Sequence, residues 1–157
     1  MAQQPAIHST FVIEKSYPKS PEKVFAAFSD PEKKRRWYGE SRGHDIGDYA
    51  LDFRVGGNEV LAVTMKAGTP IAGATLRWAQ TYDDISENHR IVFSQTLDIN
   101  GKRISVALVT VEFRATKTGC DLVFTHQAAF FEGADGPQMR EAGWKALLGN
   151  LDREMAG

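Results

Sequence analysis

From residue 44 to residue 130, apolar and polar residues alternate, and short turn signals interrupt the alternation. A side-chain period of two is typical of β-strands with one buried and one exposed face. The clearest turn signal is Asn100-Gly101, because this pair favours the tight turn of a β-hairpin. Consecutive strands joined by such short turns pair as antiparallel neighbours. The pattern therefore predicts six strands in an antiparallel meander.

The apolar positions of these strands fall in phase, and they predict which face of the sheet is buried. Most are aromatic or branched, but Gln95 and His126 are polar residues in the same phase. Aromatic bulk with a few interior polar groups suits a hydrophobic core and also a binding site for a flat apolar ligand. The residues that we predict for such a site are Phe53, Trp78, Tyr82, Phe93, Gln95, Val109, Phe124, His126, Trp144 and Leu148.

Helical signals lie between the first strand, which we place at residues 8–17, and the meander. Ser20 followed by Pro21 combines an N-cap residue with a proline at the first helical position, and Asp30 followed by Pro31 repeats the combination. These two signals predict two short helices in succession.

The C-terminal segment predicts one long helix. Pro137 lies in its first turn, and Trp144, Leu148 and Leu151 recur on one face. Because the apolar face of an antiparallel sheet needs a cover, this helix can pack across it. The sequence thus predicts an α+β fold in the order β-αα-β6-α, with a curved antiparallel seven-stranded sheet wrapped around the C-terminal helix.

The composition limits the classes of protein to which the chain can belong. Its 157 residues are 42% hydrophobic and 25% charged, so we expect a single domain at 1–157 with a core at about 8–155. The net charge of -1 provides no general attraction to nucleic acid. One cysteine, the lack of a signal-peptide pattern and the lack of a long apolar run favour a cytoplasmic protein that does not insert into a membrane.

Six segments, in their order and spacing, carry a resemblance to a known family. They are SPEKVFAAFSDPEKKRRWYG, LDFRVGG, ISENHRIVFS, VTVEF, THQAAFFEGADG and REAGWKALLGNL, and they extend over about residues 20–151. On these segments the chain resembles the START-like, or SRPBCC, superfamily, and within it the bacterial branch related to the activator of heat-shock protein 90 ATPase. The resemblance implies a helix-grip fold, like that of birch-pollen-allergen-like proteins, with a cavity for an apolar ligand.

The resemblance implies less about chemistry, because the superfamily contains binders, cyclases, hydrolases and co-chaperone domains. In close relatives the position of His126 is commonly Glu within a Thr-Glu-Gln motif, so the histidine is a departure from the pattern. In the eukaryotic activator a separate N-terminal domain accompanies this one. The printed sequence contains no such domain, which makes heat-shock protein 90, and a role in the stress response, the less favoured expectation.

Two motifs that invite a chemical interpretation are better explained by structure. In LDFRVGG, alternation places Asp52 and Arg54 on the outer face, and the pair Gly56 and Gly57 lacks the pattern of a phosphate-binding loop. A tight turn or bulge explains the glycines. The basic run at 33–36 is short, and in a nearly neutral chain we expect it to form a solvated helix face.

The titratable side chains provide few candidates for catalysis. His8, His44, His89 and His126 are far apart in sequence and show no metal-ligand spacing, so we assign no metal and no cofactor. Cys120 follows a predicted turn and has no obvious base beside it. His126 is the best single candidate: we expect a hydrogen bond to satisfy it in the interior, with a ligand anchor or a general base as the functional alternatives.

The leading hypothesis from the sequence is a protein that binds or sequesters a small hydrophobic molecule, such as a lipid, a polyketide or a flavonoid-like compound. One alternative is an enzyme of the cyclase or hydrolase type that uses His126. Another is a co-chaperone-like module that acts on heat-shock protein 90. We assign no catalytic residue, and a homodimer stays open.

Overall fold

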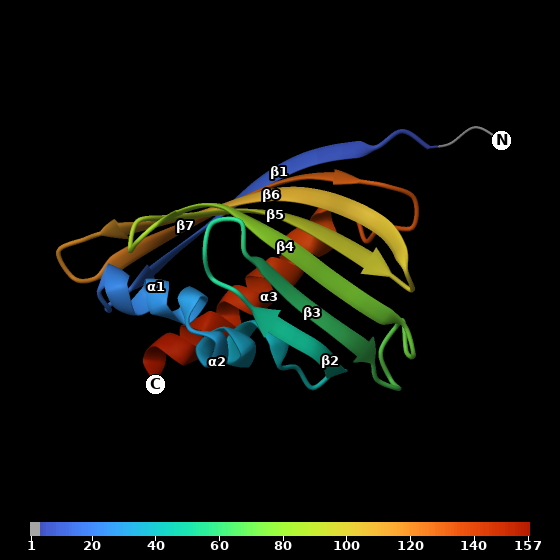
Figure 1. The fold of residues 1–157 in the computed structure, drawn as a ribbon, viewed down its shortest axis with the longest axis horizontal. Helices are drawn as coiled ribbons and strands as arrows, with labels where there is room; N and C mark the ends of the chain where they lie inside the picture. The colour runs from blue at the N-terminus through green and yellow to red at the C-terminus, as the bar shows by residue number, and fades with distance from the viewer. Residues whose placement is uncertain (1–3) are drawn as a thin grey trace.

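A computed structural model describes residues 4–157, and within this range it contains seven strands, two short helices, a π-helical turn and one long helix (Figure 1). The elements are β1 (Ile7–Tyr17), α1 (Pro21–Ser29), α2 (Pro31–Lys34), the π-helical turn η1 (Arg35–Gly39), β2 (His44–Leu51), β3 (Asn58–Met65), β4 (Thr75–Ser86), β5 (Arg90–Ile99), β6 (Lys102–Ala115), β7 (Cys120–Phe130) and α3 (Pro137–Ala156).

The strands form a single antiparallel sheet in the order β1-β7-β6-β5-β4-β3-β2. Strands β2 to β7 follow one another as a meander, and β1 pairs with β7 at the far edge, so the predicted order of elements is confirmed. Asn100 and Gly101 form the turn between β5 and β6 with φ angles of 50° and 81°. Two consecutive positive φ values are what the favoured hairpin turn requires, and Asn and Gly tolerate them best.

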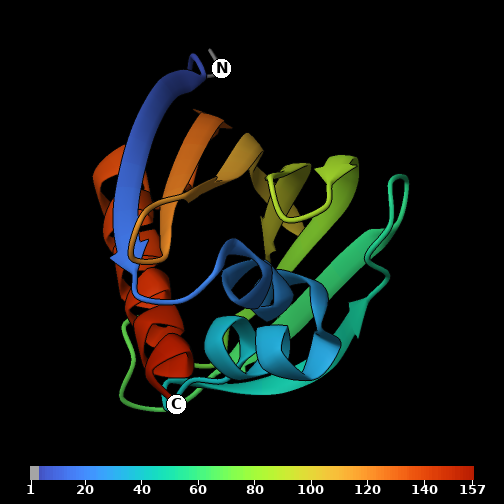
Figure 2. The ribbon, with the colours of Figure 1, turned by 90° about the vertical axis from the view of Figure 1, so that its left-hand side faces the viewer.

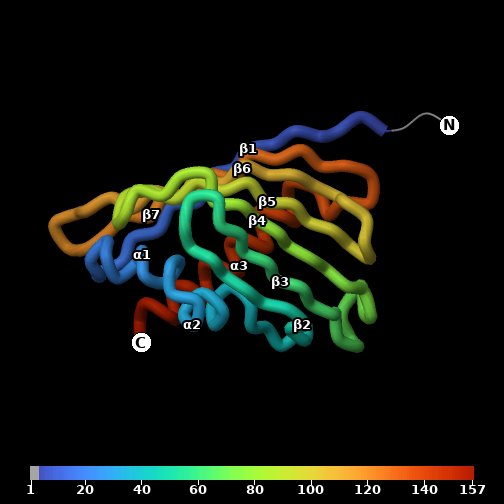
Figure 3. The backbone as a smooth tube through the Cα atoms, viewed as in Figure 1, coloured from blue at the N-terminus to red at the C-terminus, as the bar shows by residue number. Residues whose placement is uncertain are grey.

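The sheet curves around α3, which lies against its concave face (Figures 1 and 3). Figure 2 shows α1 and α2 at one end of the curved sheet, beside the C-terminal part of α3. A bidentate ion pair connects η1 to α3 at this end, because Arg36 in η1 donates to both carboxylate oxygens of Glu154 at 3.0 and 2.9 Å. Asp152 accepts hydrogen bonds from Lys15 and Tyr17, which ties the same part of α3 to β1.

The helices begin where the sequence predicts. The side chain of Ser20 accepts a hydrogen bond from the amide of Lys23, and Asp30 accepts from the amides of Glu32 and Lys33. These caps satisfy backbone donors that have no partner within the helix. The chain then continues from α2 directly into η1, and this wider turn directs Trp37 and Tyr38 into the interior, where each is less than 5% exposed.

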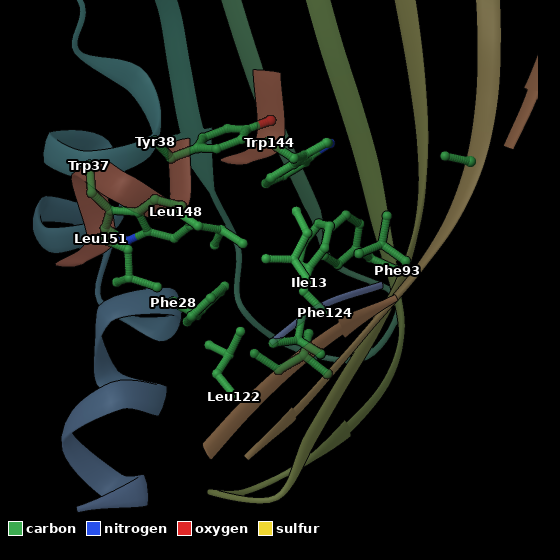
Figure 4. Close-up of a cluster of buried hydrophobic side chains, with 14 of the residues drawn as sticks. Ile13, Phe28, Trp37, Tyr38, Phe93, Leu122, Phe124, Trp144, Leu148 and Leu151 are labelled. Atoms are coloured by element: carbon green, nitrogen blue, oxygen red, sulfur yellow. The ribbon is translucent and has the colours of Figure 1, made fainter. Parts of the chain in front are cut away.

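The inner face of α3 completes the hydrophobic core. Trp144, Leu148 and Leu151 are buried and pack toward side chains of the sheet and of η1 (Figure 4). The ring of Trp144 lies 4.5 Å from that of Phe124 in β7, and 6.0 Å from that of Tyr38. The predicted cover of the sheet by the C-terminal helix is therefore confirmed.

The LDFRVGG segment is a strand end and a tight turn. Asp52 and Arg54 are exposed and pair with each other at 2.9 Å. Gly56 has a φ of +81°, and a Cβ atom at Gly57 would lie 2.2 Å from the carbonyl oxygen of Asp52. A side chain at either glycine would strain this turn, which confirms the structural interpretation of the motif. None of the helices within residues 4–157 is both long and apolar enough to cross a membrane.

Leu148 has no exposed surface, so we expect Leu148→Ala to lower the free energy of unfolding by about 2–5 kcal/mol. Lys145 on the outer face of the same helix is the matched control. Its exposed pair with Glu141 contributes at most about 0.5 kcal/mol, and Lys145→Ala should change stability by no more than that. Urea denaturation of the two variants measures both values. Equal and small losses would contradict the role of α3 in closing the core.

Candidate ligand-binding cavity

A cavity of about 300 Å³ lies between the sheet and the N-terminal half of α3. It is formed where β3 and β5 end and β4 and β6 begin, at the opposite end of the sheet from α1. This volume is at the lower end of the range for small-molecule sites. The lining residues are Tyr38, His44, Leu61, Ile71, Leu76, Trp78, Leu97, Ile99, Ile104, Asp135, Met139, Arg140, Gly143, Trp144 and Leu147.

The surface of the cavity is mostly hydrophobic. Leucine and isoleucine side chains from four strands form one wall, and Trp144 and Leu147 of α3 form the other. Gly143 faces this space, and a Cβ atom there would meet no other atom within 4 Å. A larger hollow of about 470 Å³ exists between η1 and the end of α3, but Arg36, Arg153 and Glu154 line it. Its charged surface is poorly suited to an apolar ligand.

Trp78 and Trp144 are the two predicted site residues that line this cavity. Trp78 is half-buried in β4, and Trp144 reaches the cavity from α3. The other predicted residues pack in the core or beside it, where their contribution to ligand binding stays a prediction. These residues are Phe53, Tyr82, Phe93, Gln95, Val109, Phe124, His126 and Leu148.

Phe53 shows why alternation alone does not identify the residues that line the cavity. Its ring packs edge-on against Tyr82 at 5.0 Å and against Phe25 of α1 at 5.6 Å. It therefore faces the same side of the sheet as Trp78, but at the end that α1 covers. Alternation identifies the face of a strand, whereas position along the strand decides whether that face meets a helix or open space.

An arginine provides the charged group at the rim of the cavity. Arg140, in the first turns of α3, is 6% exposed and donates to both oxygens of Asp135 at 2.7 and 2.8 Å. Its Nη2 also donates to the hydroxyl of Ser105, and the guanidinium lies over the ring of Phe130 at 5.0 Å. These contacts hold the guanidinium in one place. Arg140 cannot be recognised as a site residue from the sequence, because a single arginine in a polar helical turn has no distinctive pattern.

Behind the cavity, a buried carboxylate collects four donors. Glu59 in β3 is 1% exposed, and its Oε1 accepts from Lys34 at 2.8 Å. Its other donors are the side-chain amide of Gln80 at 2.5 Å and the hydroxyls of Tyr82 at 2.8 Å and Tyr49 at 2.7 Å. Burial and the Glu59 carboxylate raise the pKa of both tyrosine phenols, so both stay protonated donors.

Lys34 corrects the expectation that the basic run at 33–36 is a solvated face. The side chain of Lys34 is 3% exposed, and its ammonium lies 4.5 Å above the ring of Tyr38 as well as beside Glu59. Arg35 and Arg36 are exposed, and Lys33 is half-buried. The run is therefore not wholly solvated, because one of its four cations neutralises a buried carboxylate. Which of the four cations does so depends on the position of Glu59 in the folded sheet.

Gln95 connects this cluster to the cavity. Its side-chain amide nitrogen donates to Oε1 of Gln80 at 2.7 Å and to the hydroxyl of Tyr38 at 3.2 Å. Tyr38 in turn lines the cavity. His44 also lines the cavity, and its Nε2 lies 2.6 Å from the carbonyl oxygen of Gly39.

His126 lies outside the lining of the cavity and has no exposed surface. The expected hydrogen bond is wrong: among the buried side-chain nitrogen and oxygen atoms of residues 4–157, its Nδ1 and Nε2 are the ones without a partner. Its ring instead stacks on Phe11 at 4.6 Å and lies 6.4 Å from Trp144. Burial, with a smaller effect from Arg140, lowers the pKa of His126 to about 4.

The lowered pKa predicts a pH dependence of stability. Folded His126 stays neutral down to about pH 4, whereas an unfolded histidine takes up a proton below about pH 6.5. The unfolded state therefore gains protons first, and stability falls by up to about 1.4 kcal/mol for each pH unit between about pH 6.5 and pH 4. His126→Leu should remove this loss, so its advantage over the wild type should grow between pH 7 and pH 4.

Denaturation at several pH values measures this difference. His89 is exposed between β4 and β5, so His89→Gln is the control that should keep the wild-type dependence on pH. Parallel curves for the wild type and His126→Leu would contradict the prediction.

The buried ion pair predicts a strong coupling between its partners. Lys34→Met leaves the Glu59 carboxylate buried without a cation, and we expect a loss of about 3–5 kcal/mol. Adding Glu59→Gln removes the uncompensated charge, so the double variant should be more stable than Lys34→Met alone. A double-mutant cycle measured by denaturation gives the interaction energy. Additive losses would show that the two side chains do not interact.

Comparison with known proteins identifies the family. Residues 18–156 match the family described as "Activator of Hsp90 ATPase homolog 1-like protein". The chain belongs to this family. It carries the START-like, or SRPBCC, helix-grip fold that its bacterial members share, as the sequence segments predicted. No curated protein matches the chain.

Solved structures of similar proteins support the assignment. The Mll3558 protein of Rhizobium loti is 39% identical, with a TM-score of 0.85 over 96% of this chain and 99% of its own. A putative uncharacterized protein of Rhizobium leguminosarum is 34% identical, with a TM-score of 0.89 over 96% of both chains. An AHSA1-like protein of Aeromonas hydrophila, at 23% identity and a TM-score of 0.70 over 94% of this chain and 92% of its own, shares the fold.

Metal-binding and catalytic arrangements are not evident in the part of the chain that the structure describes. Within residues 4–157, no three His, Cys, Asp or Glu side chains lie close enough together to hold a metal ion. Cys120 is buried in β7, and burial raises the pKa of its thiol, which disfavours the reactive thiolate. The thiol of Cys120 is therefore a poor nucleophile.

Proposed function

We propose that this member of the family binds a small hydrophobic molecule in the cavity between the sheet and α3. The observation that carries the proposal is the contrast between the two ends of the fold. At one end α1, η1 and the aromatic core fill the space, whereas at the other end a cavity of about 300 Å³ lies among hydrophobic side chains. Burying an apolar ligand against such a surface is favourable by about 25 cal/mol for each Å² removed from water.

The mouth of the cavity supports ligand entry. Ile71 in the β3–β4 connection is 43% exposed, and Met139 at the start of α3 is 67% exposed. Large hydrophobic side chains at the rim of a cavity lose exposed area when a ligand contacts them. Gly143 lines the cavity one helical turn after Met139, and it adds no side chain there.

The volume of the cavity limits the size of the ligand. At about 30 Å³ for each water molecule of liquid, 300 Å³ holds roughly ten waters, so a ligand of about 10–15 non-hydrogen atoms fits. A bicyclic aromatic compound has this size. A long lipid chain would need the cavity to widen.

Binding of naphthalene tests the proposal. We expect the indole N–H signals of Trp78 and Trp144 to shift in NMR titrations, because both residues line the cavity. Trp37 is an internal control, since its Nε1 donates to the carbonyl oxygen of Ala27 away from the cavity. Shifts at all three tryptophans alike, or at none, would contradict binding at this site.

A pair of glycine variants adds a matched test. Gly143→Leu places a side chain in the cavity and should abolish the naphthalene shifts. Gly149→Leu adds the same side chain to the same helix, also at a position with nothing within 4 Å of a Cβ atom, but outside the cavity. It should bind naphthalene like the wild type. Both variants should gain helix stability from the loss of a mid-helix glycine.

The family description favours one alternative, a partner role toward heat-shock protein 90. Such a role would depend on the outer surface, so Gly143→Leu would leave it unchanged. A stimulation of heat-shock protein 90 ATPase activity that is equal for the wild type and Gly143→Leu, together with no naphthalene binding, would favour this alternative. We find no support for a cyclase or hydrolase that uses His126, because that side chain is sealed from the cavity.

A further inference from the structure

The buried carboxylate of Glu59 determines which group donates and which accepts in the series of hydrogen bonds that leads from Glu59 to the cavity. Glu59 accepts from the amide nitrogen of Gln80, which turns Oε1 of Gln80 toward Gln95. Gln95 must then present its own nitrogen to Gln80, and the same nitrogen donates to the hydroxyl of Tyr38. The hydroxyl oxygen of Tyr38 is therefore an acceptor in this series of hydrogen bonds, and the hydroxyl proton takes no part in the series.

The proton of Tyr38 is available to a molecule in the cavity. Among residues 4–157 no acceptor receives a hydrogen bond from Tyr38, and the side chain is 4% exposed. Figure 4 shows the hydroxyl pointing away from η1, on the side of Trp144. Burial and the nearby Glu59 carboxylate raise the pKa of the phenol well above its usual value, so it stays a donor.

Arg140 adds a second donor but little net charge. Its Nε and Nη2 bind Asp135 and Ser105, while its Nη1 has no partner within residues 4–157. Within that range, the fully enclosed side-chain nitrogen and oxygen atoms without a partner are those of His126, so Nη1 of Arg140 is not fully enclosed. Because Arg140 lines the cavity, the accessible Nη1 can donate to a ligand. Asp135 already neutralises the guanidinium, so the site does not call for an anion.

From these contacts we infer that the ligand is a neutral, mainly hydrophobic molecule of about bicyclic size with a carbonyl-type acceptor oxygen, which Tyr38 and Arg140 bind as donors. The inference rests on the proposed function of the cavity. A carboxylate ligand would lose its hydration and meet a guanidinium that is already paired, whereas a ketone gives up little hydration and gains one or two donors. A pure hydrocarbon would cover both donors and give neither a partner.

Three ligands of the same shape test this inference. Acetylnaphthalene, isopropenylnaphthalene and naphthoate, substituted at the same ring position, have the same arrangement of non-hydrogen atoms and differ in the ketone, the alkene and the carboxylate. We expect the wild type to bind acetylnaphthalene about 3–10-fold more tightly than isopropenylnaphthalene, as for one net hydrogen bond. Naphthoate should bind more weakly than the ketone. The dissociation constants come from the indole shifts of Trp78 and Trp144.

Two variants connect the preference to its donors. Tyr38→Phe keeps the ring and removes the hydroxyl, so it should weaken acetylnaphthalene about 3–10-fold, whereas isopropenylnaphthalene should bind at least as tightly as to the wild type. Tyr49→Phe also removes a buried hydroxyl near Glu59 but lies outside the cavity, and it should keep the wild-type preference. Asp135→Asn leaves the guanidinium of Arg140 without its counter-charge and should strengthen naphthoate about tenfold.

The outcomes separate this inference from the proposed function. Equal or tighter binding of isopropenylnaphthalene or naphthoate by the wild type overturns the inference and leaves hydrophobic binding in place. Equal losses of ketone affinity in Tyr38→Phe and Tyr49→Phe also overturn it. If naphthalene and all three derivatives fail to shift Trp78 and Trp144, the proposed function fails first.

Discussion

The ion pair and hydrogen bonds of the buried Glu59 carboxylate determine how the polar side chains of the interior are arranged. An acid that is 1% exposed is costly unless it is paired and fully hydrogen-bonded, and here one ammonium, one amide and two hydroxyls surround it. Its donors come from β2, β4 and α2, so the acid joins the small helical end of the molecule to one half of the sheet. Because a carboxylate only accepts, it also fixes the orientation of Gln80 and Gln95 and the proton that Tyr38 has left over.

The cavity exists because the two ends of the curved sheet are covered differently. At one end α1 and η1 add aromatic rings such as Phe25, Phe28 and Trp37, which pack edge-on with Phe113 and with one another. At the other end the N-terminal half of α3 covers the sheet, and Gly143 has no side chain there to fill the space. A single helix cannot cover the full width of seven strands, so apolar surface remains available there.

The helix-grip fold leaves the chemistry to a few side chains. The same arrangement of sheet and helix can bind, catalyse or assist another protein, so membership of the family does not decide among these functions. In this chain the side chains at the cavity are donors held in place, such as Arg140 against Asp135, and hydrophobic residues. His126 lies in the core, outside the lining of the cavity, and stacks on Phe11.

The elements, their order and the buried face of each strand could be predicted from the sequence. Period-two alternation, the Asn100-Gly101 turn and the proline caps are local signals, because each depends on the backbone conformation of neighbouring residues. That Trp78 and Trp144, among the ten predicted site residues, border open space became clear from the folded chain alone. The tertiary structure also decided that Lys34 and Glu59 meet, although 25 positions separate them in the chain. Cavity position and ion pairing depend on which elements pack together across the fold, and no periodicity within one element contains that information.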